Sequence, residues 1–119
     1  MKHLLIKCTL ILVLASCGSK NVELNSKDPQ SDAHITITGE KVSSVDPYKV
    51  NILVESQNKK ESVGTEIFSS TLDSTNVNFE WQQPGVCLIT FSQQDNSTRK
   101  ILAVALENKI GLKEIGLEN

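Results

Sequence analysis

The sequence has few of the residues that most often carry metal, redox or phosphate chemistry. Its 119 residues include three cysteines, two histidines and one methionine, and residues 18–119 keep only His34 and Cys87 from these three types. Structural zinc needs four Cys or His ligands, and blue copper needs two His and a Cys, so one chain cannot build either site from residues 18–119. C-x-x-C, glycine-rich phosphate-loop and H-E-x-x-H motifs are also missing. We therefore predict no metal, no cofactor and no catalytic residues.

Long apolar runs are missing as well. The longest, residues 8–14, is far shorter than the ~20 residues that a membrane-spanning helix requires. Lys2 and Lys7 precede this run, and the small residues Ala15 and Ser16 follow it. A basic start, a short apolar core and small residues at its end are typical of a cleaved export signal.

The residues that close this run, Leu14-Ala15-Ser16-Cys17, resemble the lipobox of bacterial lipoproteins. The resemblance implies cleavage between Ser16 and Cys17, which makes residues 1–16 a signal peptide, and acylation of the Cys17 thiol. It also implies that the chain contacts membrane lipid through acylated Cys17. The next residue is Gly18, whereas an Asp there resembles an inner-membrane retention signal. We therefore expect a lipid-anchored cell-envelope protein on the outer membrane, facing the periplasm.

Cleavage changes the charge balance of the chain. The full sequence has 12 Lys and Arg against 14 Asp and Glu, and loss of Lys2 and Lys7 leaves ten against fourteen, a net charge of −4. Nucleic-acid-binding proteins normally have a basic patch or stripe. The acidic balance therefore predicts no nucleic-acid partner.

Residues 17–33 have the composition of a flexible tether. Between Gly18 and Ala33 the apolar residues are only Val22, Leu24 and Ala33, among many Ser, Asn, Lys and Asp. Such a segment buries too little surface to offset the entropy cost of ordering it. We predict that the lipidated cysteine and a tether, 17–33, lead into a single domain at 34–119.

The domain has the alternating pattern of half-buried strands. Apolar and polar residues alternate through 77–82, and a similar alternation runs through 35–38 and 50–55. Gln83-Pro84-Gly85-Val86 suits a type II turn that joins two strands. The predicted strands are about 34–38, 48–56, 65–71, 76–82, 86–92, 98–106 and 110–115. Residues 99–106 are apolar on both faces, so a short buried helix is the alternative there. We predict an all-β fold, a single seven-stranded antiparallel β-sandwich.

A second resemblance lies in the hairpin Phe79-x-Trp81-x-x-Pro84-Gly85-x-Cys87-x-Ile89-x-Phe91. It is similar to the closing hairpin of transthyretin-like, carboxypeptidase regulatory-type sandwich modules, although Cys87 stands where that family usually has Tyr. The resemblance implies a non-catalytic module and carries over no functional residues. For the sandwich as a whole we predict a transthyretin-like or immunoglobulin-like Greek-key topology.

A few side chains are candidates for contacts or modification. Tyr48 and Trp81 are the possible ligand contacts, because aromatic rings can stack on sugars, although Trp81 is in phase with core residues. Ser74 is a possible O-glycosylation site, because Asp73-Ser74-Thr75 resembles a bacterial sequon. His34 is expected to be a solvated residue at a strand end. Cys87 is expected to be a small buried hydrophobe, with intermolecular pairing as the alternative.

These features predict a non-enzymatic module for protein binding or assembly, with an envelope protein of unknown identity as partner. The alternative is a carbohydrate- or cell-wall-binding module that uses Tyr48 or Trp81. A small hydrolase or inhibitor that uses strand-face carboxylates such as Glu80 or Asp95 is the third reading.

Overall fold

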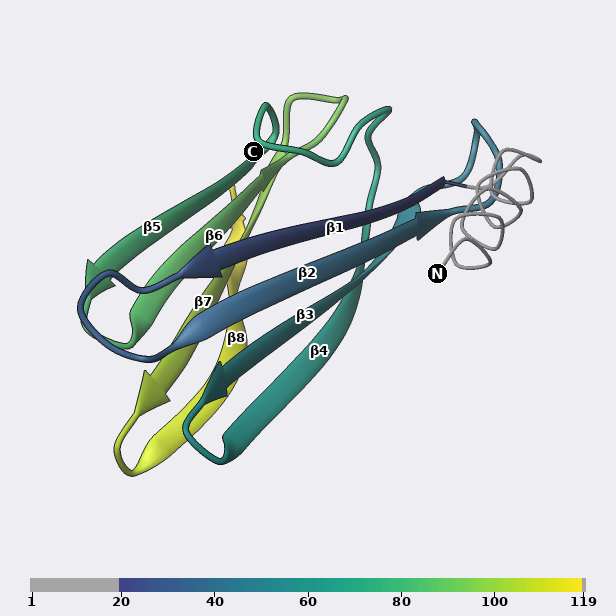
Figure 1. Cartoon of the computed structure of the whole chain (residues 1–119). Coiled ribbons are helices and arrows are strands. Elements are labelled where there is room, and N and C mark those ends of the chain that lie inside the picture. Colours follow the sequence, from purple (N-terminus) through teal and green to yellow (C-terminus); the bar gives the residue numbers. More distant parts are fainter. Residues whose placement is uncertain (1–19, 119) are drawn as a thin grey trace, which may run out of the picture.

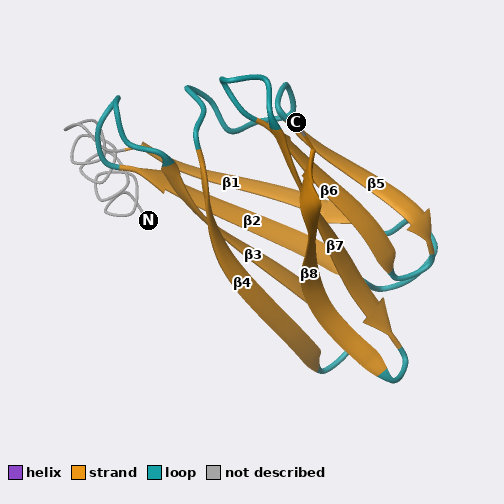
Figure 2. Cartoon of the chain, turned by 180° about the vertical axis from the view of Figure 1, so that it is seen from behind, coloured by secondary structure: helices purple, strands orange, loops and turns teal. Residues whose placement is uncertain are grey.

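A computed structural model describes residues 20–118 of the chain (Figure 1). The predicted signal peptide, the cleavage position at Ser16 and the lipidated Cys17 lie outside the described residues. Between residues 20 and 118 the protein is all-β, with turns and loops but no helix (Figure 2).

Eight strands form two four-stranded antiparallel sheets, which we call sheet A and sheet B. Sheet A has the order β1-β2-β3-β4 and sheet B the order β5-β6-β7-β8, so every strand pairs with its neighbours along the chain. The strands are β1 (Lys20–Lys27), β2 (His34–Lys41), β3 (Tyr48–Ser56), β4 (Lys59–Ile67), β5 (Val77–Gln83), β6 (Val86–Ser92), β7 (Thr98–Leu106) and β8 (Lys109–Glu118).

The two sheets face each other across one core. Their inner faces supply a continuous cluster of buried side chains that includes Ile37 and Ile52 from sheet A and Ile89, Phe91 and Ile101 from sheet B. The first strands of the two sheets, β1 and β5, meet at one side of the sandwich. There Trp81 Nε1 of β5 donates a hydrogen bond to Ser26 Oγ of β1 at 2.9 Å. The arrangement is a sandwich of two consecutive meanders.

This architecture corrects several predictions. The sandwich has eight strands, not seven, and the extra strand β1 occupies residues assigned to the tether. The prediction of a flexible tether is therefore wrong for residues 20–33. The Greek-key topology is also wrong for the described residues, because each sheet joins only consecutive strands. The strand predicted at 65–71 is β4 at Lys59–Ile67, which follows a turn at residues 57–58.

Other predictions are confirmed. Strands at 48–56, 86–92 and 98–106 have the predicted bounds, so residues 99–106 are strand and not helix. The turn at Pro84-Gly85 has Gly85 at φ +81°, the value that a type II turn needs at its third position. A Cβ at Gly85 would lie 2.6 Å from the Ala105 carbonyl oxygen, so glycine is also required by space.

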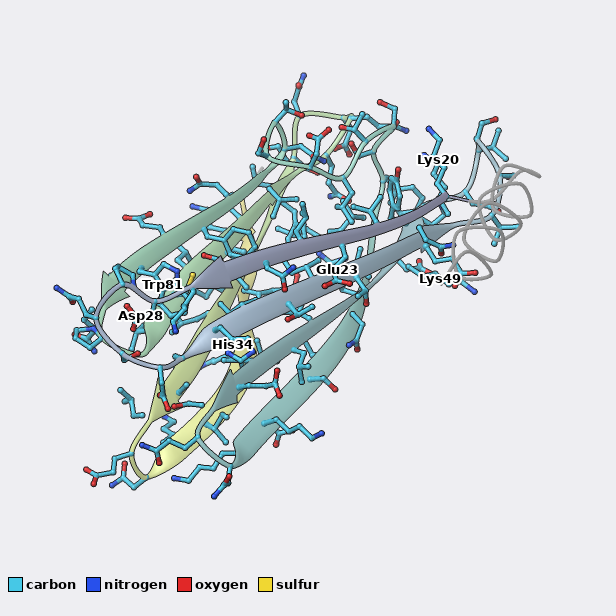
Figure 3. All side chains as sticks on the ribbon, in the orientation of Figure 1. Lys20, Glu23, Asp28, His34, Lys49 and Trp81 are labelled. Atoms are coloured by element: carbon cyan, nitrogen blue, oxygen red, sulfur yellow. The ribbon has the colours of Figure 1, made fainter. Side chains whose placement is uncertain are left out.

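The two ends of the sandwich differ in their loops. We call the end where β1 begins the Lys20 end; it carries loops 42–47 and 93–97 and the crossover 68–76 between the sheets. We call the opposite end the Asp28 end; it carries loop 28–33 and the turns at 57–58, 84–85 and 107–108. Figure 3 shows Lys20 and Lys49 near the first end and Asp28 near the second.

Candidate functional site

Tyr48 is buried, contrary to its prediction as a ligand contact. It is 2 % exposed, and its ring lies between the core and the Lys41 ammonium, whose Nζ is 4.9 Å from the ring centroid. The ring points inward because Tyr48 shares the inner face of β3 with Val50 and Ile52. A side chain in this position offers no ring surface to a sugar, so this prediction is wrong.

Trp81 is half-buried at the side of the sandwich where β1 and β5 meet. Its indole nitrogen already donates to Ser26, and its ring packs against the core cluster. Trp81 and Tyr48 therefore do not form a shared aromatic platform. The ring of Trp81 acts mainly as a contact between the two sheets.

His34 and Cys87 lie as the sequence predicted. His34 sits on the outer face of sheet A, half exposed, with Nε2 2.9 Å from Glu55 Oε1 on the neighbouring strand. Cys87 is fully buried, and burial raises the pKa of its thiol to about 12. A buried protonated thiol is a poor nucleophile, and Cys87 is accordingly a core residue.

Ser74 is exposed on the crossover between the sheets. Its neighbour Asp73 accepts hydrogen bonds from the Thr75 hydroxyl at 2.5 Å and the Thr75 amide at 2.9 Å. These bonds hold the pKa of Asp73 below its ordinary value. The predicted O-glycosylation of Ser74 remains a prediction, on a residue that solvent reaches.

Asp28 is a buried carboxylate that sequence analysis did not single out. Its Oδ2 accepts from the Gly85 amide at 2.6 Å and the Ser31 hydroxyl at 2.5 Å, and Oδ1 accepts from the Gln30 amide at 2.9 Å. Burial opposes its ionisation, but the bonds from Ser31, Gln30 and Gly85 prevail and the net pKa of Asp28 is lowered. Because all three donors belong to the chain itself, Asp28 joins loop 28–33 to sheet B and is structural.

A surface hollow of about 580 Å³ lies over β1, β2 and β3. Polar and charged residues line most of it, including Glu23, Glu40 and Lys49, and no aromatic ring does. A sugar-binding groove normally offers an aromatic face on which the sugar stacks. This hollow therefore lacks the feature on which the carbohydrate prediction depended.

The outer face of sheet B is the most unusual surface of the described chain. In the halves of β6 and β7 nearest the Asp28 end, the side chains that point away from the core are again apolar, whereas Thr90 and Lys100 farther along the same face are polar. The outer apolar residues are Val86, Leu88, Leu102, Val104, Leu106 and Ile115, and we call them the sheet B face.

The outer face of sheet A is different. Its strands present Glu, Lys, Asn, Thr and Ser side chains outward, and the large apolar exception is Leu53, which is half-buried. A sheet with one solvated face normally has a polar outer surface, as sheet A does. In β6 and β7, sheet B has apolar residues on both faces, a pattern more usual in a sheet that is covered on both sides.

Charges border the sheet B face on opposite sides. Glu80, Leu88, Leu102 and Lys113 are successive register partners, so they form one row across the sheet. Glu80 and Lys113 are exposed and the two leucines are half-buried. The row therefore presents an acidic margin, an apolar centre and a basic margin.

Within residues 20–118 no group of three or more His, Cys, Asp or Glu is placed to hold a metal ion. No helix in that part of the chain is long and apolar enough to cross a membrane. Comparison of the chain with protein families, with characterised proteins and with solved structures finds no match.

Proposed function

We propose that the protein is a membrane-anchored cell-envelope lipoprotein whose β-sandwich is a non-enzymatic module for binding another protein. The lipobox resemblance at Leu14-Ala15-Ser16-Cys17 supports the anchor, with acylated Cys17 in the outer membrane and the sandwich in the periplasm. The apolar sheet B face carries the binding part of the proposal. Its partner is an envelope protein.

Leaving the apolar sheet B face in contact with water costs free energy. Apolar surface removed from water contributes about 25 cal/mol per Å². Scattered apolar residues on a surface are ordinary, but here two adjacent strands have them at consecutive outward positions: half-buried Leu88 and buried Val86 lie beside half-buried Leu102 and Val104. Contiguous apolar surface with a charged margin is characteristic of protein interfaces, which have an apolar centre and a polar rim.

The experiment is crosslinking followed by recovery of the protein from its own membranes. Leu102→Asp places a carboxylate in the centre of the sheet B face. Leu53→Asp is the matched control, because Leu53 is also a half-buried outward residue of an inner strand, on sheet A. We expect Leu102→Asp to lose the crosslinked partner and Leu53→Asp to keep it. Recovery of the same partner with both variants would contradict the proposal.

The carbohydrate alternative has less support. It depended on Tyr48 and Trp81, and Tyr48 is buried while Trp81 is engaged with Ser26. Retention of the wild-type protein on a glycan array, together with failure to recover any protein partner, would favour it over the protein-binding proposal.

A further inference from the structure

The Lys20 end of the sandwich lies next to the proposed lipid anchor. Two residues, Gly18 and Ser19, lie between Cys17 and Lys20, and each of the three steps along the chain spans at most about 3.6 Å. The start of β1 therefore lies within roughly 11 Å of an acylated Cys17. Because β1 belongs to the folded sheet, the domain cannot stand away from the bilayer as it could on a long tether.

The most exposed large apolar side chains of the described residues gather at this same end. Val45 is 87 % exposed, Val42 is 57 % exposed and Phe68 is 48 % exposed. Val42 and Val45 belong to loop 42–47, which directly follows the strand paired with β1 (Figure 1). Aliphatic side chains presented on a loop beside an acyl anchor are suited to the boundary between lipid headgroups and acyl chains.

A small basic hollow lies beside this loop. It has a volume of about 220 Å³ and is lined by Lys20, Lys41, Ser43, Ser44 and Ser70. Lys20 and Lys41 are direct register partners on β1 and β2, and like charges in such positions repel. The hollow thus combines two cationic side chains with three hydroxyl groups.

Lys41 is an unusual residue for a structural role. It is only 7 % exposed, its Nζ donates to the Ser69 carbonyl oxygen at 2.6 Å, and it takes part in neither ion pair among the described side chains. Its partners, the Ser69 carbonyl oxygen and the face of the Tyr48 ring, carry no net charge, and an anion in the hollow would further offset the cost of burying the ammonium. A phosphate group fits, because its oxygens accept charge-assisted bonds from lysine and bonds from hydroxyl groups.

We propose that the anchored sandwich rests on the bilayer by its Lys20 end, with Val42 and Val45 at the acyl-chain boundary and a phospholipid phosphate in the Lys20–Lys41 hollow. This inference rests on the proposed acylation of Cys17. Asp95 on loop 93–97 of sheet B favours a tilted placement in which the β1 and β2 side of this end approaches the lipid, and Asp46, next to Val45, opposes deeper insertion of loop 42–47.

Site-directed spin labelling of the membrane-purified chain tests this placement. A nitroxide is attached at Val45→Cys, or at Asn58→Cys in the exposed turn at the Asp28 end as the matched control. Buried Cys87 does not compete for the label. The protein is placed in vesicles of phosphatidylethanolamine and phosphatidylglycerol, and collision rates with oxygen and with a water-soluble nickel complex are compared. Mass spectrometry first establishes whether Cys17 is acylated.

We expect the ratio of oxygen to nickel collisions to be severalfold higher at position 45 than at position 58, and Lys20→Gln to lower the ratio at position 45. Equal ratios at the two positions in acylated protein would overturn the docking. A high ratio at position 45 that Lys20→Gln leaves unchanged would overturn the phosphate site. Protein without an acyl group would instead refute the anchor, and with it the proposed function.

Discussion

Asp28→Ala removes a carboxylate that is 2 % exposed and holds loop 28–33 against the turn at Gly85. Three donors lose their acceptor: the Gly85 amide, the Ser31 hydroxyl and the Gln30 amide. Hydrogen bonds to a charged group contribute about 1.5–3 kcal/mol each. The bonds from Ser31 and Gln30 are part-buried, so in the variant water can replace some of their contribution. The variant also no longer has the cost of burying a carboxylate.

The net loss in the free energy of unfolding is therefore expected to be about 3 kcal/mol, dominated by the buried Gly85 amide. Domains of this size are stable by about 5–15 kcal/mol, so the loss is large and measurable by urea unfolding. Asp46→Ala is the matched control, because Asp46 is an exposed carboxylate in a loop. A loss below about 0.5 kcal/mol, the usual range for surface substitutions, would refute the structural role of Asp28.

The same carboxylate predicts a pH dependence. The pKa of Asp28 is lowered in the folded state from an ordinary value of 3.8. Its stabilising contribution is therefore present above pH 3.8 and is lost as the pH falls through the lower folded-state pKa. The difference in unfolding free energy between wild type and Asp28→Ala should be constant near neutral pH and shrink below about pH 4. Asp73 and Asp95, whose pKa values are also lowered, affect both proteins alike.

Three further changes test other contacts. Gly85→Ala should lower the free energy of unfolding by about 2–4 kcal/mol, because φ is +81° and a Cβ would lie 2.6 Å from the Ala105 carbonyl oxygen. The control Gly111→Ala should change it little, because the space around a Cβ at Gly111 is open. Equal shifts in melting temperature for the two variants would contradict this expectation. Trp81→Phe should cost about 1 kcal/mol through the lost bond to Ser26, and an unchanged urea midpoint would contradict it. Cys87 should resist iodoacetamide at pH 8 until the protein is unfolded, as followed by peptide mass, because its thiol is buried with a pKa of about 12; labelling of the folded protein at the rate of a free thiol would show that it is accessible.

The strands that sequence analysis predicted correctly are mostly those with one clearly buried face. Strands β3 and β6 each direct alternate residues into the core, and their predicted bounds match the structure. The hairpin of β5 and β6 was also predictable, since its turn needs Pro and Gly in adjacent positions. The similarity of that hairpin to transthyretin-like modules stays a prediction.

The strands that it missed or misplaced are edge strands. β1 buries only one face and only in part, with Val22 and Leu24 as its apolar contacts, so its composition is that of a polar linker. β4 begins with Lys59, Lys60 and Glu61, all exposed, and charged residues are common on edge strands because they oppose pairing with other chains. Tertiary pairing with β2 and β3 stabilises these two strands despite their sequences.

The candidate sites differ in how far sequence could reveal them. The ambiguity of residues 99–106 between strand and helix came from apolar residues on both faces of this strand. That pattern could have indicated the apolar sheet B face. Asp28 could not be recognised, since its partner Gly85 is distant in sequence and its own loop reads as a polar turn. The hollow lined by Lys20 and Lys41 forms because β1 pairs with β2. It could not be predicted, because the residues of β1 were assigned to a flexible tether.

The central claim is that Cys17 anchors this sandwich to a membrane, and the intact mass of the protein purified from bacterial membranes tests it most directly. We expect a chain that begins at Cys17 and carries the added mass of acyl groups, and we expect Cys17→Ala protein to keep residues 1–16 and gain no such mass. A membrane-purified wild-type chain that retains residues 1–16, or that begins at Cys17 without acyl mass, would contradict it.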